Sequence, residues 1–264
     1  MEIPEERWFK AIFERESRRK FNSQKIEKTK IESLQNLIDK VNDFLPGVRI
    51  VLVENRIDDI FTGIIGSYGK ITGASVYLAF IGNTAVSHID ENIGYGGETL
   101  ILEATSLGLD SCWVSGTFKA DNVKEDIKLS KNEKIYAVSP IGYAEDKPAL
   151  SEKILKKMVS SHKRKDMEEL VLHEIDNEWP KWIKTALKAA RLAPSAVNRQ
   201  PWRFIIKDNT IIITAKKDIK TSNYSYKLDC GSAMLHIHIG SLKEGVTGKW
   251  EYLDDDYIAK FSVN

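Results

Sequence analysis

The sequence predicts an α+β protein made of two related halves. Helical and strand patterns alternate along its 264 residues without the regular strand–helix–strand rhythm of a doubly wound parallel sheet, which favours α+β. Three landmarks also recur at a constant offset of 137 residues: Gly94, Gly108 and Trp113 correspond to Gly231, Gly245 and Trp250. We therefore expect a first half at roughly 1–155 and a shorter second half at roughly 156–264, packed together as an internal pseudo-dimer.

The first half begins with two amphipathic helices. Apolar residues at 8, 9, 12 and 13 mark the first, and apolar residues at three- and four-residue steps between Ile31 and Val41 mark the second, which Pro46 and Gly47 end. Strands follow at 49–53 and 75–81, the latter apolar enough to be buried on both faces. A helical stripe ends at Gly108 in a C-cap role, and residues 135–138 form a further strand.

The second half repeats parts of this order. The Lys- and Glu-rich stretch 150–172 predicts two helical pieces, and Trp182, Ala186, Ala189 and Ala193 mark a helical face closed by Pro194. Residues 203–213 are typical of two strands joined by an Asp-Asn turn. The helical pattern at 232–244 repeats that at 95–107, but nothing after Trp250 resembles residues 114–147.

The composition excludes several classes of function. The 39 basic and 38 acidic side chains give a net charge of +1, so no strong field attracts nucleic acid or an anionic membrane. The acidic residues 1–6 lack the apolar stretch of a secretory signal, and polar residues interrupt the longest uncharged stretch, 71–89. We expect a cytoplasmic protein that binds neither nucleic acid nor membranes.

Cysteine and histidine offer no metal site. Cys112 and Cys230 are too few and too distant for a disulfide framework or a zinc site, and the five histidines lack ligand spacing with them. His236 and His238 lie two residues apart and share a face only on a strand. We interpret both as structural, and we expect no bound metal.

Two segments combine tight turns with groups that bind anions or polar rings. Arg15–Phe21 carries arginine and serine side chains suited to a phosphate, although a solvated basic helix end would look the same. Ala193–Phe204 places Ser195, Asn198 and Gln200 after a helix, where they can bond a heteroaromatic edge or sugar hydroxyls. Alternatively, that segment is only a helix end followed by turn-forming residues.

Two further segments are weaker on their own. Gly108–Phe118 is a loop of small residues that can bring backbone N–H groups to a flat ligand. The basic run Lys163-Arg164-Lys165 follows Ile141-Gly142-Tyr143 along the chain and, by itself, is typical of a solvated face.

Together the four segments resemble the nitroreductase family of flavin mononucleotide (FMN) enzymes. In chain order they are similar to that family's R-R-S-x-R-x-F, G-L-G-S-C-W-x-G-x-F, I-G-Y…R-K-P-L-E-E-L and A-P-S-x-x-N-x-Q-P-W-x-F motifs. In the family the A-P-S motif precedes the G-L-G motif, whereas here it lies in the second half. This order resembles the subgroup in which a tandem duplication makes a single-chain pseudo-dimer, and it implies a mixed or antiparallel sheet flanked by helices.

The resemblance implies a cofactor site shared by both halves. It places Arg15 and Ser17 on the flavin phosphate, and Glu16 stands where the family usually has a basic residue. The remaining contacts that it implies are Arg19, Lys163 and Arg164 as supporting positive charge, Trp113, Val114 and Ser115 along the ring from the first half, and Pro194, Ser195, Ala196 and Asn198 from the second. Since only one combination of motifs is complete, we expect one FMN per chain, and a monomer can hold the site.

The activity implied is that of an FMN-dependent NAD(P)H oxidoreductase. NADH or NADPH would reduce the flavin, and a nitroaromatic, quinone or similar small acceptor would then take the electrons in a ping-pong sequence. The resemblance implies no catalytic side chain, because flavin N5 carries the chemistry. Two alternatives stay open: a flavin-binding protein without turnover, and a related FMN enzyme such as a dehalogenase.

Overall fold

Our computed structural model describes residues 1–54, 57–61, 70–146, 163–176, 178–216, 225–254 and 256–264. Its first group of elements is α1 (Glu5–Glu14), α2 (Lys28–Phe44), β1 (Val48–Val53), α3 (Ile57–Ile60), β2 (Val76–Asn83), α4 (Ile89–Ser106), β3 (Asp110–Ser111), α5 (Ala120–Asp126) and β4 (Glu133–Gly142). Its second group is α7 (Met167–Leu170), α8 (Lys181–Ala190), the 3-10 turn η1 (Ala196–Asn198), β5 (Trp202–Lys207), β6 (Thr210–Ala215), α9 (Tyr226–Lys243), β7 (Gly248–Tyr252) and β8 (Tyr257–Val263).

The strands form two antiparallel sheets of the same design. The first has the order β1-β2-β4-β3 and the second the order β5-β6-β8-β7. In each sheet, the strand that comes last in the sequence lies between the second and third strands. Each sheet also has an irregularity in its central pairing, between Phe80 and Ile81 in the first and between Ile213 and Thr214 in the second. The α+β fold predicted from the sequence is confirmed.

The end of the chain differs from expectation. No sequence similarity linked the residues after Trp250 to 114–147, yet β8 takes the place in the second sheet that β4 takes in the first. A strand needs only alternating burial to fill that place, and β8 buries Ile258, Ala259 and Phe261 without copying β4. The expected boundary near residue 155, and most of the expected helical stretch 150–172, lie outside the described residues; within 163–172 the structure forms only α7.

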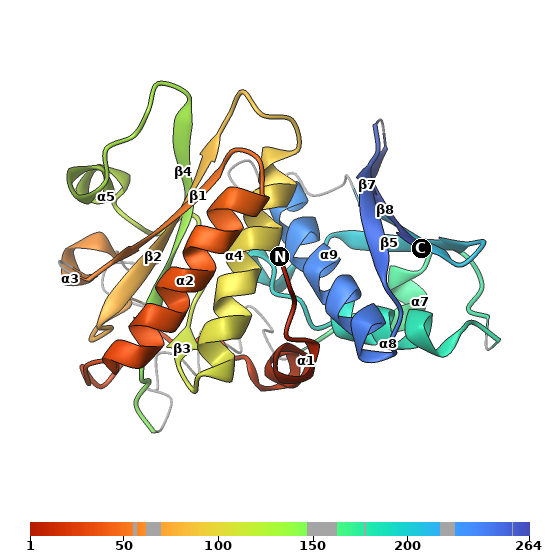
Figure 1. Cartoon of the computed structure of the whole chain (residues 1–264), viewed down its shortest axis with the longest axis horizontal. Helices are drawn as coiled ribbons and strands as arrows, with labels where there is room; N and C mark the ends of the chain where they lie inside the picture. Colours follow the sequence, from red (N-terminus) through yellow and green to blue (C-terminus); the bar gives the residue numbers. More distant parts are fainter. Residues whose placement is uncertain (55–56, 62–69, 147–162, 177, 217–224, 255) are drawn as a thin grey trace.

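Two long helices, α4 and α9, lie side by side between the sheets (Figure 1). Each has 18 residues, and each is followed by a glycine with positive φ, Gly108 at 76° and Gly245 at 72°. They contact at Gly94 and Gly231, where a Cβ added to either glycine would lie 2.0 Å from Leu228 O or 2.1 Å from Glu91 O, respectively. Both helices begin six residues before the predicted pattern, and their first turns bury polar residues, Glu91 and Asn92 in α4 and Asp229 in α9.

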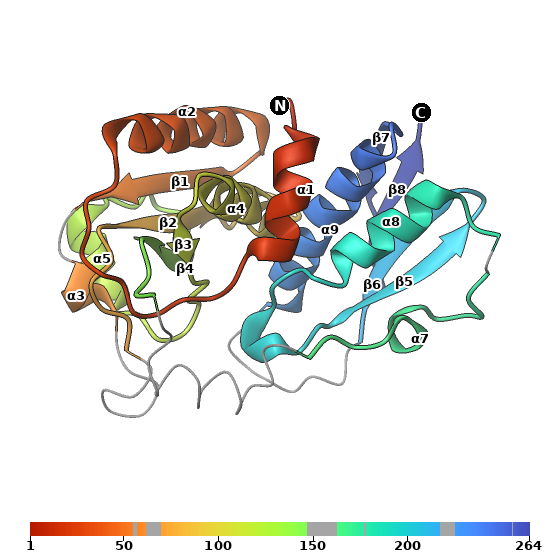
Figure 2. The same cartoon turned by 90° about the horizontal axis from the view of Figure 1, so that it is seen from below.

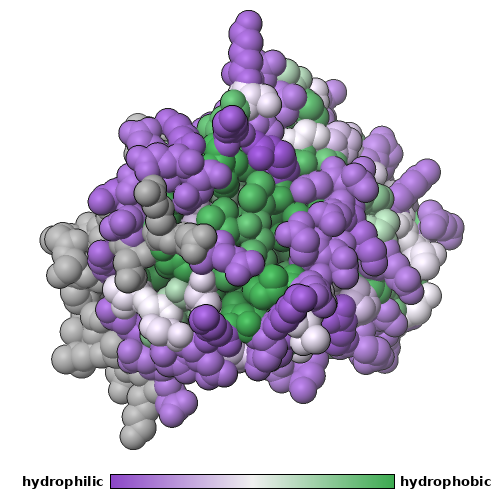
Figure 3. Space-filling model, turned by 60° about the vertical axis from the view of Figure 1, so that its left-hand side comes forward, coloured by the Kyte–Doolittle hydropathy of each residue, from purple (hydrophilic) through white to green (hydrophobic). Residues whose placement is uncertain are grey.

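The two sheets share one apolar core. Helices α2 and α4 cover one face of the first sheet, α8 and α9 cover one face of the second, and α1 lies against both α4 and α9 (Figure 2). A smaller apolar cluster packs on the first sheet's other face, around Tyr77, Ala79 and Ile81. Apolar side chains also gather at the centre of the surface on that side of the molecule (Figure 3).

Local signals account for several elements. The Asp208-Asn209 turn has φ values of 48° and 57°, as a two-residue hairpin requires, so the predicted hairpin is confirmed. His236 and His238 lie on the helix α9 rather than on a strand, and so do not share a face. None of the helices in the described part of the chain combines the length and apolar character that a bilayer crossing needs.

Candidate functional site

Three of the four motif segments lie side by side along the first sheet. The chain leaves α1 at Arg15 and passes β3, where Ser17 pairs with Ser111 and Arg18 N donates to Ser111 O at 2.9 Å. It then pairs with the end of β4, where Glu145 N donates to Lys20 O at 3.0 Å. The fold thus brings residues 15–21, 108–118 and 141–145 together.

The fourth segment, 193–204, makes a constrained turn. Val197, Asn198 and Gln200 have φ values of 47°, 56° and 47°, a region that a β-branched valine rarely adopts. Ser195 Oγ accepts from Gln200 N at 2.9 Å, and the buried Asp229 of α9 accepts from Ala196 N at 3.1 Å. Such strain persists only where surrounding contacts hold it, and it is typical of ligand-binding segments.

The basic run 163–165 docks on this turn. Arg164 Nη1 donates to Asn198 Oδ1 at 2.9 Å, and Asn198 Nδ2 donates to Lys163 O at 2.9 Å. Lys165 N donates to Gln200 Oε1 at 2.9 Å, while the Lys163 side chain is exposed. Arg164 and Asn198, predicted from motifs 34 residues apart, therefore form one unit.

Arginines from both halves meet at this unit. The Arg15 side chain is only 7% exposed, and within the described parts of the chain its Nε has no hydrogen-bond acceptor. Burial lowers the pKa of Arg164, and the nearby positive charges of Arg15 and Arg191 lower it further, to about 10. The approach of two like charges is unfavourable, and an anion bound between them would relieve it.

A fully buried carboxylate stands behind Arg15. Glu98 Oε1 lies 3.9 Å from Arg15 Nε and 3.1 Å from Nε2 of the fully buried His236, while Glu98 Oε2 accepts from Trp113 Nε1 at 2.8 Å. His236 Nδ1 is 2.9 Å from Ala189 O. Since that carbonyl can only accept, Nδ1 carries a hydrogen, and one further proton is shared between His236 Nε2 and Glu98 Oε1. This network (Glu98, His236, Trp113 and Arg15) ties α4 to α9.

Sequence reasoning missed Glu98 and assigned His236 no partner. Neither residue belongs to a motif, and each lies among small or apolar residues of a buried helix. That setting is the signal that could have found them, because a charged residue inside a buried stripe needs a partner.

The other residues predicted from the first half lie in different surroundings. The Trp113 indole stacks on Phe80 with ring centroids 4.5 Å apart, so it is held in the core. Val114 is buried and bonds Val138 through both backbone groups at 2.9 Å. Glu16 is exposed, and Ser17, Arg19 and Ser115, like Pro194 of the second half, are half-buried.

At the related position on the other side of the helix pair, the structure differs. Asn92, which the 137-residue offset matches to Asp229, donates to Pro46 O at 3.2 Å, much as Asp229 holds Ala196. Tyr252, which the offset matches to Ser115, bonds Asn92 and stacks on His88 with centroids 4.3 Å apart and planes 3° apart. Aromatic rings therefore stack at the position that the offset matches to Ser115.

Comparisons with known proteins identify the family. The profile of the family named "Putative TM nitroreductase" matches residues 7–241. The chain belongs to this family. A crystal structure named "putative nitroreductase" from Thermotoga maritima has the same fold, with a TM-score of 0.62 and 17% identity, covering 100% of this chain and 97% of that one.

Other relatives match more narrowly. A protein of Mycobacterium tuberculosis named "Putative NAD(P)H nitroreductase acg" is 34% identical over 74 residues, which span 26% of this chain and only 22% of the relative. A structure from Clostridium difficile named "FMN-dependent Nitroreductase" is 19% identical, with a TM-score of 0.43, and covers 56% of this chain and 94% of its own.

Proposed function

We propose that this family member is an FMN-dependent oxidoreductase that takes electrons from NADH or NADPH, with the flavin phosphate bound between Arg15 and Arg164. The observation that carries the proposal is the proximity of these two guanidinium groups, one from each half, with Arg15 Nε buried and without an acceptor among the described residues. Phosphate oxygens are strong acceptors for such groups, and arginine matches their geometry. The residues present therefore fit the phosphate of FMN.

The rest of the site supports the proposal. Asn198 fixes the Arg164 guanidinium, and Asp229 fixes the turn that carries Asn198, so the second half presents a preorganised edge. The 15–21 segment holds the opposite edge against β3. When bound, FMN supplies the electron-transfer chemistry, and these side chains bind and orient it. The acceptor we propose is a nitroaromatic, quinone or similar conjugated molecule, reduced by a ping-pong mechanism.

The same arrangement argues for an internal pseudo-dimer with one flavin. Arg15 and Arg164 come from different halves, and Tyr252 and His88 stack at the related position. Purified protein should therefore carry one FMN per chain even when light scattering shows a monomer, as flavin absorbance against protein concentration will measure. Two flavins per chain, or flavin bound only by dimers, would contradict this stoichiometry.

The activity is tested by the absorbance spectrum. We expect a yellow protein whose flavin band bleaches under anaerobic NADH or NADPH and returns when a nitroaromatic or quinone is added. A yellow protein that neither donor bleaches would instead be a flavin-binding protein without turnover. Bleaching followed by reoxidation with halogenated aromatics alone would indicate a dehalogenase.

Replacing Arg15 by alanine should weaken FMN binding by about 1.5–3 kcal/mol, the range for hydrogen bonds to charged groups. Quenching of flavin fluorescence on titration measures this change. Arg49→Ala is the matched control, because Arg49 forms a comparable buried-edge ion pair with Glu133, at 2.7 Å, away from the site. Equal FMN affinity in Arg15→Ala and the control would remove Arg15 from the phosphate site.

A further inference from the structure

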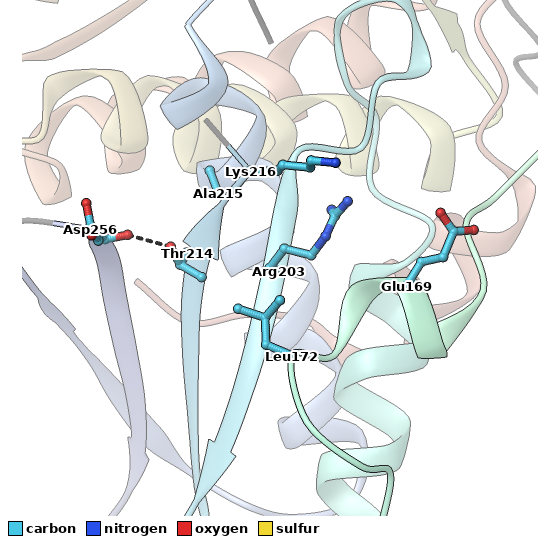
Figure 4. Close-up of a pocket in the computed structure, with 7 residues that line it drawn as sticks. All are labelled: Glu169, Leu172, Arg203, Thr214, Ala215, Lys216 and Asp256. Atoms are coloured by element: carbon cyan, nitrogen blue, oxygen red, sulfur yellow. Dashed lines mark hydrogen bonds between the residues drawn. The ribbon is translucent and has the colours of Figure 1, made fainter. Parts of the chain in front are cut away.

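A cavity of about 570 Å³ lies in the second half, and none of the predicted cofactor residues lines it. Figure 4 shows the residues that line it: Glu169 lies on α7 and Leu172 follows that helix, while Arg203 projects from β5 and Lys216 directly follows β6. Its volume lies within the range of about 300–1,000 Å³ that is usual for small-molecule sites. The cavity is therefore large enough for a ligand of its own.

Arg203 is the buried cation of this cavity. The residue is 8% exposed, and its Nη1 donates to the main-chain oxygens of Trp202 at 2.7 Å and Gln200 at 3.1 Å. These contacts fix the guanidinium, but they use only one of its three nitrogens. Arg203 has no ion pair with any residue that the structure describes, so Nε and Nη2 lack the carboxylate that a buried arginine ordinarily has.

The first sheet shows how the same position is satisfied there. Arg49 pairs with Ile81 and Arg203 pairs with Thr214, and each partner directly follows the irregularity of its strand. Arg49 Nε and Nη2 each donate to an oxygen of Glu133 at 2.7 Å. The two arginines therefore hold equivalent places in equivalent sheets, one with a bidentate carboxylate and the other facing a cavity.

Basic side chains gather around Arg203. Burial lowers the pKa of Lys165, and the nearby Arg203 and Lys216 charges lower it further, against the opposing effect of Glu169. Arg203 and Lys216 thus both lie within electrostatic reach of Lys165, and Glu169 acts on both Lys165 and Arg203. Asp256 is the second acidic residue of the lining, and its main-chain oxygen accepts from Thr214 Oγ1. Leu172 and Ala215 add carbon surface to the wall, which suits an apolar ligand body.

We propose that this cavity binds a small carboxylic acid with an apolar body, whose carboxylate takes on Arg203 the bidentate position that Glu133 takes on Arg49. Carboxylate and guanidinium groups match in this two-bond geometry. The proposal does not depend on FMN, since it concerns residues outside the cofactor site.

Fluorine NMR on the purified full-length protein tests it, with 4-fluorobenzoate as the probe and 4-fluorobenzamide as its neutral isostere. Native protein should broaden the benzoate signal at least tenfold more strongly than the amide signal. Arg203→Gln should abolish that difference, whereas Arg49→Gln, the matched control in the first sheet, should keep it. Equal binding of acid and amide, benzoate binding unchanged in Arg203→Gln, or no binding at millimolar probe would overturn the proposal.

A second variant keeps the test decisive if Arg203→Gln does not fold. Ala215→Trp fills the cavity and leaves Arg203 in place, and Ala215 is half-buried at the end of β6, so the larger ring extends into the cavity rather than the core. Circular dichroism checks that the variant is folded. A folded Ala215→Trp protein that still binds the benzoate would place the probe elsewhere and reject the cavity as the site.

Discussion

Replacing Gly94 by alanine is expected to lower the free energy of unfolding by about 3 kcal/mol, the upper end of the usual cost of overpacking. The new Cβ would lie 2.0 Å from Leu228 O, and that atom belongs to the α9 backbone, which cannot rotate away as a side chain can. The helices α4 and α9 must therefore separate, and the core that both halves share must open with them. Urea unfolding followed by circular dichroism measures the change.

Gly108→Ala is the matched control for this prediction. The backbone at position 108 also favours glycine, because its φ is 76°, but a Cβ added to Gly108 would meet nothing within 4 Å. It should cost only about 1 kcal/mol of backbone strain. If the two variants lose equal stability, the contact between α4 and α9 is not as close as the structure has it. Gly231→Ala should resemble Gly94→Ala, and the double variant should cost less than the sum, since both open the same crossing.

Replacing Glu98 by alanine is expected to cost about 3–5 kcal/mol, the range for removing one partner of a buried ion pair. The change leaves His236 Nε2 and Trp113 Nε1 without their acceptor, and it removes the carboxylate beside the buried Arg15. The midpoint of urea unfolding, with the slope unchanged, measures the loss.

Glu98→Gln separates the negative charge of the side chain from its hydrogen bonds. An amide oxygen still accepts from Trp113, and an amide N–H can donate to a neutral His236 Nε2 while Nδ1 continues to donate to Ala189 O. We expect this variant to lose less than about 1.5 kcal/mol. A loss as large as that of Glu98→Ala would mean that the negative charge itself, rather than the shared hydrogen bonds, holds α4 and α9 together.

Features set by local or repeated patterns were predictable from the sequence. The glycines Gly94 and Gly231 recur at a fixed offset because each is where a backbone must approach its partner, so the sequence pattern records a contact. The Asp208-Asn209 turn was predictable because few residues accept its φ values. Arg164 and Asn198, expected in one site on separate motifs, do bond each other.

Features that depend on tertiary partners were not predictable. Glu98 and His236 lie 138 residues apart, and only the packing of α4 on α9 makes them neighbours. Arg203 lies inside a motif of the second half, but only comparison with the sheet position of Arg49 shows that its guanidinium lacks an ion pair within the described residues. Strand β8 was missed because backbone hydrogen bonds to β6 fix its place in the sheet. Many apolar sequences can form such bonds, so no particular residue pattern marks the strand.

Because α4 and α9 belong to one chain, a residue on one helix can change without a change at the equivalent position of the other. In a pair of identical subunits, one codon change alters both sides at once, so a change useful on one side must be tolerated on the other. Here Asn92 contacts Tyr252 and Pro46, while Asp229 contacts Arg199 and Ala196. Equivalent helix positions thus carry different chemistry, and one side can keep a strained turn while the other is free to form different contacts.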